Sequence, residues 1–255
     1  MAKSNRVLFV AGEVTPFAET SSIAALARTL PEQLQESSDY EARVMMPCYG
    51  SINERKHSLH EVIRLSGTDV PMGDTTETLT VKVASVPGVR LQVYFMDHES
   101  YFPSDNLPDA PADSYEDVVR QALFFNRAAL ETIRKLRWDP DLVHAFGWMS
   151  GLIPLLLTSD FADAEHLTPS KSIFTPDDMD PGTAITPELA SGLDFSLNGS
   201  GPSTFSEIGA HHADASISPP GHSPTNGGPQ FDVDDTHHGE QLASFYDQML
   251  NEVPA

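Results

Sequence analysis

One stretch of the sequence, residues 6–34, constrains the fold more than any other. It begins with a short apolar run rich in β-branched residues at 7–11 and continues through a polar turn. Apolar residues then recur at helical spacing from residue 23 to residue 34. This pattern predicts a β-strand that leads into a helix. Ligands of open α/β sheets bind beyond the carboxyl ends of the strands, so we expect the turn from Glu13 to Ser22 to bind one.

The alternation of strand and helix continues to about residue 175. Apolar runs predict strands at 42–46, 142–146 and 172–175, and alternating runs at 60–65, 79–86 and 90–96 predict an inserted β-hairpin. Ser114 and Asp117 have the spacing of a capping box, which begins a long predicted helix. We expect Pro31 to kink the first helix or start a new turn, and Pro154 to kink a helix at 148–158. Together these elements predict an α/β fold with a doubly wound, mainly parallel sheet.

The composition changes after residue 175. Residues 176–230 are rich in Pro and Gly, at a density typical of irregular chain. Residues 213–218 still predict a short strand, and residues 241–250 predict a short helix. We therefore expect one domain over residues 1–222, loop-rich from residue 176, and an acidic tail rich in His, Gly and Pro at 223–255.

The charge balance is strongly acidic, with 37 Asp and Glu against 15 Lys and Arg and a formal net charge of -22. Nucleic acids and anionic membranes are therefore poor partners, because their phosphates would be repelled. The scarcity of lysine fits a protein adapted to high salt, which screens such repulsion, although an ordinary acidic protein is the alternative. The single cysteine, Cys48, and the lack of a membrane-length apolar run predict a soluble, cytoplasmic protein.

Several segments resemble the bacterial glycogen synthases and plant starch synthases. VLFVAGEVTPFAETSSI resembles their first strand and its SEVAPFAKTGGL turn, and ARVMMPCYGSI resembles the second strand and its MPRYG turn. FFNRAALE resembles FFSRAALE, PDLVHAFGWMSGLIPLLL resembles PDIVHAHDWHTGLVPLLL, and FSEIGAHHADASISPP resembles the segment that ends the N-terminal domain. The resemblance covers residues 5–222. It implies the Rossmann-like N-terminal half of a GT-B glycosyltransferase that uses ADP-glucose, without the second domain.

The resemblance implies a donor site at the first turn, where the family places a lysine and two glycines against phosphate. Glu19, Ser21 and Ser22 stand at these positions, whereas Glu13 matches a glutamate of the family. Reversing a charge about 4 Å from a phosphate turns an attraction of roughly 4 kcal/mol into a repulsion, at an effective dielectric near 20. We therefore expect Ser21 and Ser22 to cap the following helix, and Glu13 to bond neighbouring backbone amides.

The family's second site, HAHDWH, corresponds to residues 144–149. Its sugar-facing histidine and aspartate fall on Phe146 and Gly147. His144 and Trp148 are kept, but a buried histidine and an aromatic residue that opens a helix explain both. The third site, TIHN, corresponds to residues 174–177 and has lost its polar pair. The resemblance therefore implies no catalytic residue in this chain, and no cofactor is expected.

Histidines and aspartates near the end of the chain have the chemistry to bind a divalent metal. They lie in a region without helix or strand spacing, so a solvated tail is the preferred interpretation and no metal site is predicted. The residues concerned are His211, His212, His222 and 232–238.

Three functions remain open from the sequence. In the first hypothesis, the chain is a binding or regulatory module that does not transfer glucose on its own, and its exposed cleft face binds an α-glucan or a protein partner. Alternatively, it is an ADP-glucose-dependent glucosyltransferase that another chain completes. The third hypothesis is a structural component of a carbohydrate-related complex.

Overall fold

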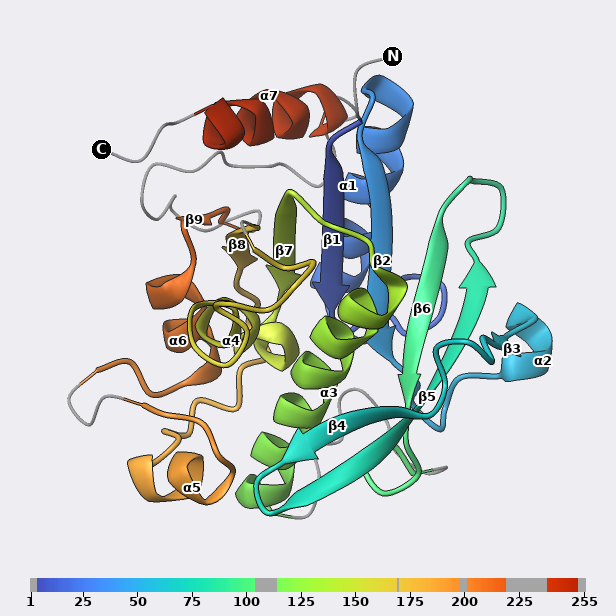
Figure 1. Ribbon diagram of the computed structural model, residues 1–255. Helices are drawn as coiled ribbons and strands as arrows, with labels where there is room; N and C mark the ends of the chain where they lie inside the picture. Colours follow the sequence, from blue (N-terminus) through green and yellow to red (C-terminus); the bar gives the residue numbers. More distant parts are fainter. Residues whose placement is uncertain (1–3, 104–113, 169, 198–200, 219–237, 252–255) are drawn as a thin grey trace.

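A nine-stranded sheet forms the centre of the molecule in a computed structural model (Figure 1). The structure describes residues 4–103, 114–168, 170–197, 201–218 and 238–251. The strands are β1 (Arg6–Ala11), β2 (Glu41–Pro47), β3 (His60–Glu61), β4 (Thr68–Met72), β5 (Thr75–Ser85), β6 (Gln92–Asp97), β7 (Leu142–Phe146), β8 (Lys171–Thr175) and β9 (Ala215–Ser216). Their order is β3-β5-β6-β2-β1-β7-β8-β9, and β4 pairs with β5.

Helices lie on both faces of this sheet. In Figure 1, α3 crosses the face toward the viewer, and α1 lies behind β1 and β2. The pairs from β6 through β9 are parallel, and β5 is antiparallel to β6. The predicted doubly wound, mainly parallel sheet is therefore confirmed. The helical segments are α1 (Ile23–Ser37), α2 (Glu54–His57), α3 (Tyr115–Leu136), η1 (Trp148–Ser150), α4 (Ile153–Thr158), α5 (Pro187–Gly192), α6 (Phe205–His212) and α7 (His238–Asn251).

The core lies against the central strands. Residues 7–11 of β1 and all of β7 are buried, which is why both strands are almost continuously apolar. The long helix α3 begins at Ser114, whose hydroxyl accepts the backbone N–H of Asp117, as the sequence predicts. Among the described residues, no helix has the length and apolarity needed to cross a membrane.

The predicted hairpin is present between β5 and β6, but the neighbouring segment differs. Only residues 60–61 of the expected strand at 60–65 form β3, and β4 is an additional strand. The proline predictions fare differently. Pro31 lies inside a continuous α1 and opens no new helix, so a kink there stays a prediction. The predicted kink at Pro154 is wrong, because Pro154 lies in the first turn of α4. That position suits proline because the first N–H groups of a helix have no partner within it.

The C-terminal part of the chain carries three further elements. The segment that resembles the end of the family's N-terminal domain forms α6 and the short β9. The predicted terminal helix is confirmed and extends over His238–Asn251. It packs against α1 and buries Leu242, Tyr246 and Met249 in the core. The division of the chain at residue 222 stays a prediction.

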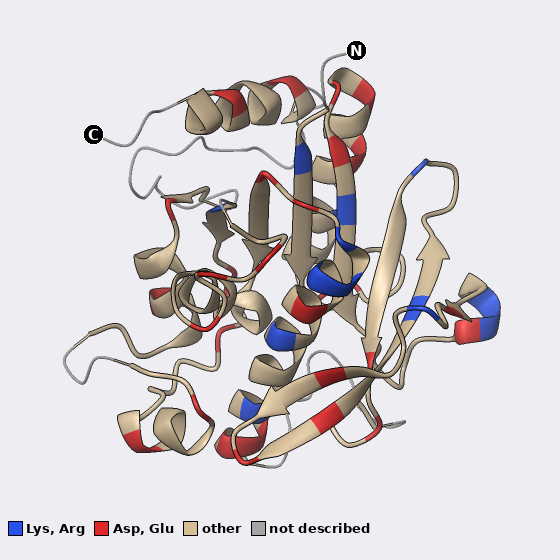
Figure 2. Cartoon of the chain, viewed as in Figure 1, with Lys and Arg blue, Asp and Glu red and all other residues tan. Residues whose placement is uncertain are grey.

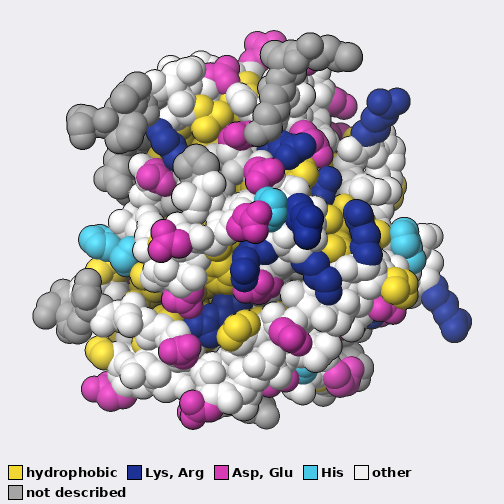
Figure 3. All heavy atoms as spheres, in the orientation of Figure 1, with side chains coloured by type: hydrophobic (Ala, Val, Ile, Leu, Met, Phe, Trp, Pro, Cys, Tyr) yellow, Lys and Arg dark blue, Asp and Glu magenta, His cyan; other side chains and the backbone are white. Residues whose placement is uncertain are grey.

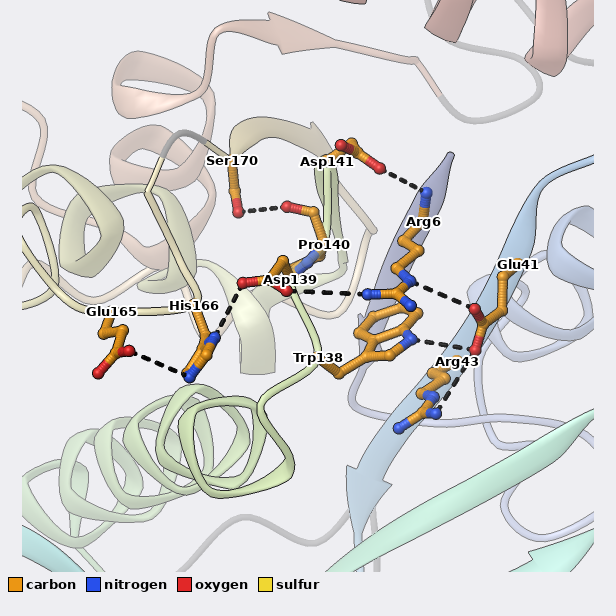
Figure 4. Close-up of polar contacts among 10 residues, drawn as sticks. All are labelled: Arg6, Glu41, Arg43, Trp138, Asp139, Pro140, Asp141, Glu165, His166 and Ser170. Carbon is orange, nitrogen blue, oxygen red and sulfur yellow. Dashed lines mark hydrogen bonds and ion pairs between the residues drawn. The ribbon is translucent and has the colours of Figure 1, made fainter. Parts of the chain in front are cut away.

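A charged network joins the amino-terminal ends of β1, β2 and β7 (Figure 4). The Arg6 guanidinium lies 3.3 Å from Glu41 and 3.8 Å from Asp139. Trp138 is buried, and its indole N–H donates to Glu41 at 3.0 Å. The Arg43 guanidinium lies 4.6 Å from the centre of the Trp138 ring, within cation–π range. This end of the sheet is therefore held by paired charges around one aromatic ring.

Candidate functional site

A small pocket lies at the carboxyl ends of β1, β2, β7 and β8, and we call it the strand-end pocket. The sheet has β2 on one side of β1 and β7 on the other, so the strand order reverses at β1. Ligands of open α/β sheets bind at such a reversal. The predicted turn at 13–22 forms one wall. The lining residues are Gly12, Glu13, Thr20, Ser21, Ile23, Tyr49, Phe146, Trp148, Met149, Asp177 and Met179.

The strand-end pocket is nearly filled by protein. Its volume is about 20 Å³, enough for about one water molecule. Phe146 is fully buried beneath it, and a Cβ added at Gly12 would lie 2.8 Å from Cβ of Met149. A nucleotide sugar therefore has no space here in this conformation.

Glu13 organises the turn between β1 and α1. Its carboxylate is buried and accepts the backbone N–H groups of Thr20 at 3.2 Å and Ser21 at 2.8 Å. It also accepts both hydroxyls at 2.5 Å. The interpretation of Glu13 as an acceptor for neighbouring amides is confirmed. The amides of this turn are therefore already bonded to a carboxylate.

The expected capping of α1 by serine is wrong. Ser22 occupies the N-cap position in a helical conformation and its side chain makes no cap hydrogen bond. Side-chain capping favours extended backbone at that position. The Ser21 hydroxyl donates to Glu13, a charge-assisted hydrogen bond that orients this side chain toward the carboxylate. Glu19, at the position of the family's lysine, is exposed.

His144 lies in the core between the sheet and α7. Its Nδ1 lies 2.6 Å from the Tyr246 hydroxyl, and its Nε2 lies 2.8 Å from the Thr175 hydroxyl. Its ring stacks on Phe146 with 4.0 Å between the centroids. Burial lowers the pKa of His144 to about 3, so the ring is neutral. The geometry agrees with the core interpretation, since both ring nitrogens have core partners.

Gly147 and Asp177 fit each other closely. Gly147 has a φ of +72°, and a Cβ there would lie 2.3 Å from an Asp177 carboxylate oxygen. The other oxygen accepts the backbone N–H of Trp148 at 3.2 Å. Burial raises the pKa of Asp177 to about 6. Trp148 itself is buried and packs against Phe205 at 5.3 Å between ring centroids.

Asp177 and Tyr49 are the pocket residues that sequence reasoning missed. Asp177 follows β8 by two residues, and Tyr49 follows β2 by two, so their positions beyond strand ends were the available signal. Burial, with the nearby carboxylates of Glu13 and Asp177, raises the pKa of Tyr49. The pocket therefore carries two carboxylates and a phenol.

Positive charge is missing from the described lining of the strand-end pocket, which contains no Lys, Arg or His. The shortage extends along the whole sequence, in which Asp and Glu outnumber Lys and Arg by 37 to 15; Figure 2 marks the described ones on the backbone. Cations and free amide donors are what hold a phosphate in a protein site. The described lining supplies no cation, and the amides of Thr20 and Ser21 are already bonded to Glu13, so its chemistry suits hydroxyl groups better than an anion.

The structure offers no metal centre within the ranges it describes, where three or more His, Cys, Asp or Glu side chains do not converge. The rings of His211 and His212 lie 4.9 Å apart at the end of α6. His238 begins α7 and is buried. The remaining candidates, His222 and residues 232–237, lie outside the described residues.

Comparisons with known proteins agree with this architecture. Residues 6–187 match the family model of the starch synthase catalytic domain. A glycogen synthase from Chlorobium phaeovibrioides is 40% identical over 178 residues, which are 69% of this chain and 36% of the relative. One from Chlorobaculum parvum is 41% identical over 165 residues, covering 64% and 34%. The chain thus spans about a third of the length of these relatives.

A solved structure gives the same fold. It is the catalytic domain of starch synthase IV from Arabidopsis thaliana bound to ADP and acarbose, and it superposes with a TM-score of 0.69. The match covers 96% of this chain and 50% of that chain, at 16% sequence identity. The family match over most of the chain, the sheet order and the shared fold lead to one conclusion: this chain belongs to the starch synthase catalytic domain family.

Proposed function

We propose that this chain is a glycogen synthase-related module that does not transfer glucose on its own and binds an α-glucan or a protein partner at its cleft face. The observation that carries the proposal is the strand-end pocket. It has room for about one water and carries the carboxylates of Glu13 and Asp177. A diphosphate leaving group needs cations or free amides to stabilise its charge. The described lining of this pocket has no Lys, Arg or His, and the amides of Thr20 and Ser21 are bonded to Glu13.

The same chemistry supports a neutral ligand. Carboxylates accept hydrogen bonds from sugar hydroxyls, and Thr20 is an exposed residue of the pocket lining. Met179, 40% exposed, adds an apolar surface beside them. The starch synthase of similar fold was solved with acarbose, which makes an α-glucan the first ligand to test.

The alternative is a glucosyltransferase completed by another chain. It is favoured by the fold, which this chain shares with a starch synthase catalytic domain. A separate polypeptide that supplies the rest would bring its own groups to the cleft face. In that case the closed pocket would have to open when the second chain binds.

Two assays separate these functions. We expect no transfer of labelled glucose from ADP-glucose to glycogen by the purified chain at low or high salt, and co-sedimentation of the chain with glycogen. Transfer by the lone chain that disappears in Trp148→Ala would overturn the proposal. If the chain does not co-sediment with glycogen at any salt concentration, a protein partner or a structural role remains. Pull-down of a second chain, followed by the transfer assay with both chains, would then distinguish these two.

Adaptation to high salt is a further part of this proposal. The formal net charge of -22 creates repulsion that salt screens, because the Debye length falls from about 10 Å at 0.1 M to about 3 Å at 1 M. We expect the melting temperature to rise with potassium chloride across this range. A melting temperature that stays constant or falls would contradict adaptation to high salt. We also propose that the protein is cytoplasmic.

A further inference from the structure

A second and larger pocket lies between α3, β4, the end of α4 and the segment after α5. Its volume is about 400 Å³, within the roughly 300–1,000 Å³ range of small-molecule sites. It shares no lining residue with the strand-end pocket. We call it the Arg127 pocket, after the buried side chain at its floor.

Arg127 fixes the shape of this pocket. Its guanidinium donates to the carbonyl oxygens of Pro71 at 2.9 Å, Leu193 at 3.2 Å and Asp194 at 2.6 Å. It also pairs with the Asp160 carboxylate at 2.7 Å. The Arg127 side chain is only 4% exposed, and these bonds hold three separate segments around it. The walls are therefore ordered before any ligand arrives, which lowers the entropic cost of binding.

The charges on the walls are paired. Arg134 donates to both carboxylate oxygens of Glu131 at 2.9 Å, and Asp160 is paired with Arg127. Figure 3 shows the corresponding face, on which Lys and Arg side chains alternate with Asp and Glu. A charged ligand would be attracted by one member of each ion pair and repelled by the other. A neutral ligand can bond to these groups without separating the pairs.

The remaining lining groups also fit a neutral ligand with many hydroxyls. Ser191 and Ser196 are exposed residues of the lining, whereas Phe161 and Phe195 are buried. A hydroxyl both donates and accepts, so it matches a wall on which carboxylates and guanidinium groups alternate.

We propose that the Arg127 pocket binds a neutral polyhydroxylated ligand, such as one end of a short oligosaccharide. Asp160 and Glu131 accept its hydroxyl hydrogens, and Arg134 and the serines bond to its oxygens. This site does not depend on the function proposed for the strand-end pocket.

The test is an NMR titration of the full chain with maltotriose as the neutral probe. We expect chemical-shift changes at Ser191 and Arg134. The variant Ser191→Trp fills the pocket from an exposed position of α5 and should weaken binding about tenfold, which corresponds to about 1.4 kcal/mol. The matched control Glu188→Trp lies on the same helix, exposed and outside the pocket lining, and should leave the affinity unchanged.

Other outcomes would overturn the proposal. They are unchanged binding in Ser191→Trp, the absence of any shift with maltotriose, or displacement of maltotriose by glucose 1-phosphate or spermidine at equal concentration. Shifts confined to Thr20 and Ser21 would also overturn it, while supporting glucan binding at the strand-end pocket instead. If Ser191→Trp fails to fold, Arg134→Gln provides the second variant, with the same expected loss of affinity.

Discussion

The two ends of the central sheet handle charge in opposite ways. At the amino-terminal end, Arg6 and Arg43 lie beside Trp138, and Glu41 accepts from both the indole and a guanidinium. At the carboxyl-terminal end, Glu13 and Asp177 bond to backbone amides, and the described pocket lining offers them no cation. One end therefore pairs its charges, and the other buries carboxylates of a single sign.

This difference separates stability from ligand chemistry. Paired charges around a buried ring fasten three strand ends, as a purely structural region requires. An unpaired buried carboxylate costs stability, which is reflected in the raised pKa of Asp177. Groups that reduce stability are concentrated at functional sites, so the carboxyl-terminal end is where binding should be sought.

The largest effect should come from the amino-terminal end. We expect Trp138→Ala to lower the free energy of unfolding by about 3–5 kcal/mol, because it leaves a cavity and removes the partner of Glu41 and Arg43. Urea denaturation measures this loss. Trp138→Phe keeps a ring and should lose only about 1 kcal/mol. Equal losses in the two variants would show that the indole N–H, rather than the packing, dominates.

At the carboxyl-terminal end, we expect a substitution to raise the free energy of unfolding rather than lower it. The pKa of Asp177 is about 6 in the folded protein against an ordinary 3.8, so its ionisation opposes folding as pH rises from 3.8 through 6. Asp177→Asn removes that penalty and should stabilise the protein by about 3 kcal/mol at pH 8, and by little at pH 4. If Asp177→Asn is instead less stable than wild type at pH 8, the ionised Asp177 carboxylate is stabilised by its surroundings, as the carboxylate of Glu41 is at the other end of the sheet.

His144 should make the free energy of unfolding depend on pH in the other direction. Its folded pKa of about 3 lies below the ordinary 6.5, so the stability it contributes is complete above pH 6.5 and is lost as pH falls toward 3. Between pH 7 and pH 5 the loss should be about 2 kcal/mol. Asp177 opposes this change over the same range, so the loss should be clearest in Asp177→Asn. Adding His144→Asn to that variant should flatten the profile, and a profile left steep would assign the effect to another group.

The smallest effect concerns the turn itself. Glu19→Lys places a cation at the exposed position that resembles the family's lysine. Wild type should show no binding of ADP at this turn, and the added charge should contribute only roughly 1 kcal/mol to binding, because solvent screens an exposed charge. Calorimetric titration measures it, with Glu188→Lys as the control on α5. The same gain in both variants would indicate a general charge effect rather than a local one.

The two ends also differ in how far the sequence predicts them. The strands and the sheet type follow from apolar runs such as residues 7–11, and the resemblance to glycogen synthases follows from local motifs. Bonds between distant residues could not be predicted in this way. Trp138 reaches Glu41 across 97 residues, and Asp177 reaches the backbone of Trp148 across 29.

Side-chain competition explains the errors at the candidate site. Ser21 is a good helix cap by type, but its hydroxyl is oriented by a charge-assisted hydrogen bond that it donates to the Glu13 carboxylate. The resemblance gives Asp177 no role, because residues 174–177 correspond to the family's TIHN segment and lack its polar pair. Only the fold shows that Gly147 leaves room for its carboxylate.

The most direct measurement is a titration of the isotopically labelled chain with ADP-glucose, followed by NMR at the amides of Thr20, Ser21 and Trp148. These amides bond to Glu13 or Asp177, so saturating ADP-glucose should leave their chemical shifts unchanged. Saturable shifts at Thr20 and Ser21, with release of their bonds to Glu13, would show that the turn accepts the diphosphate and would contradict the account.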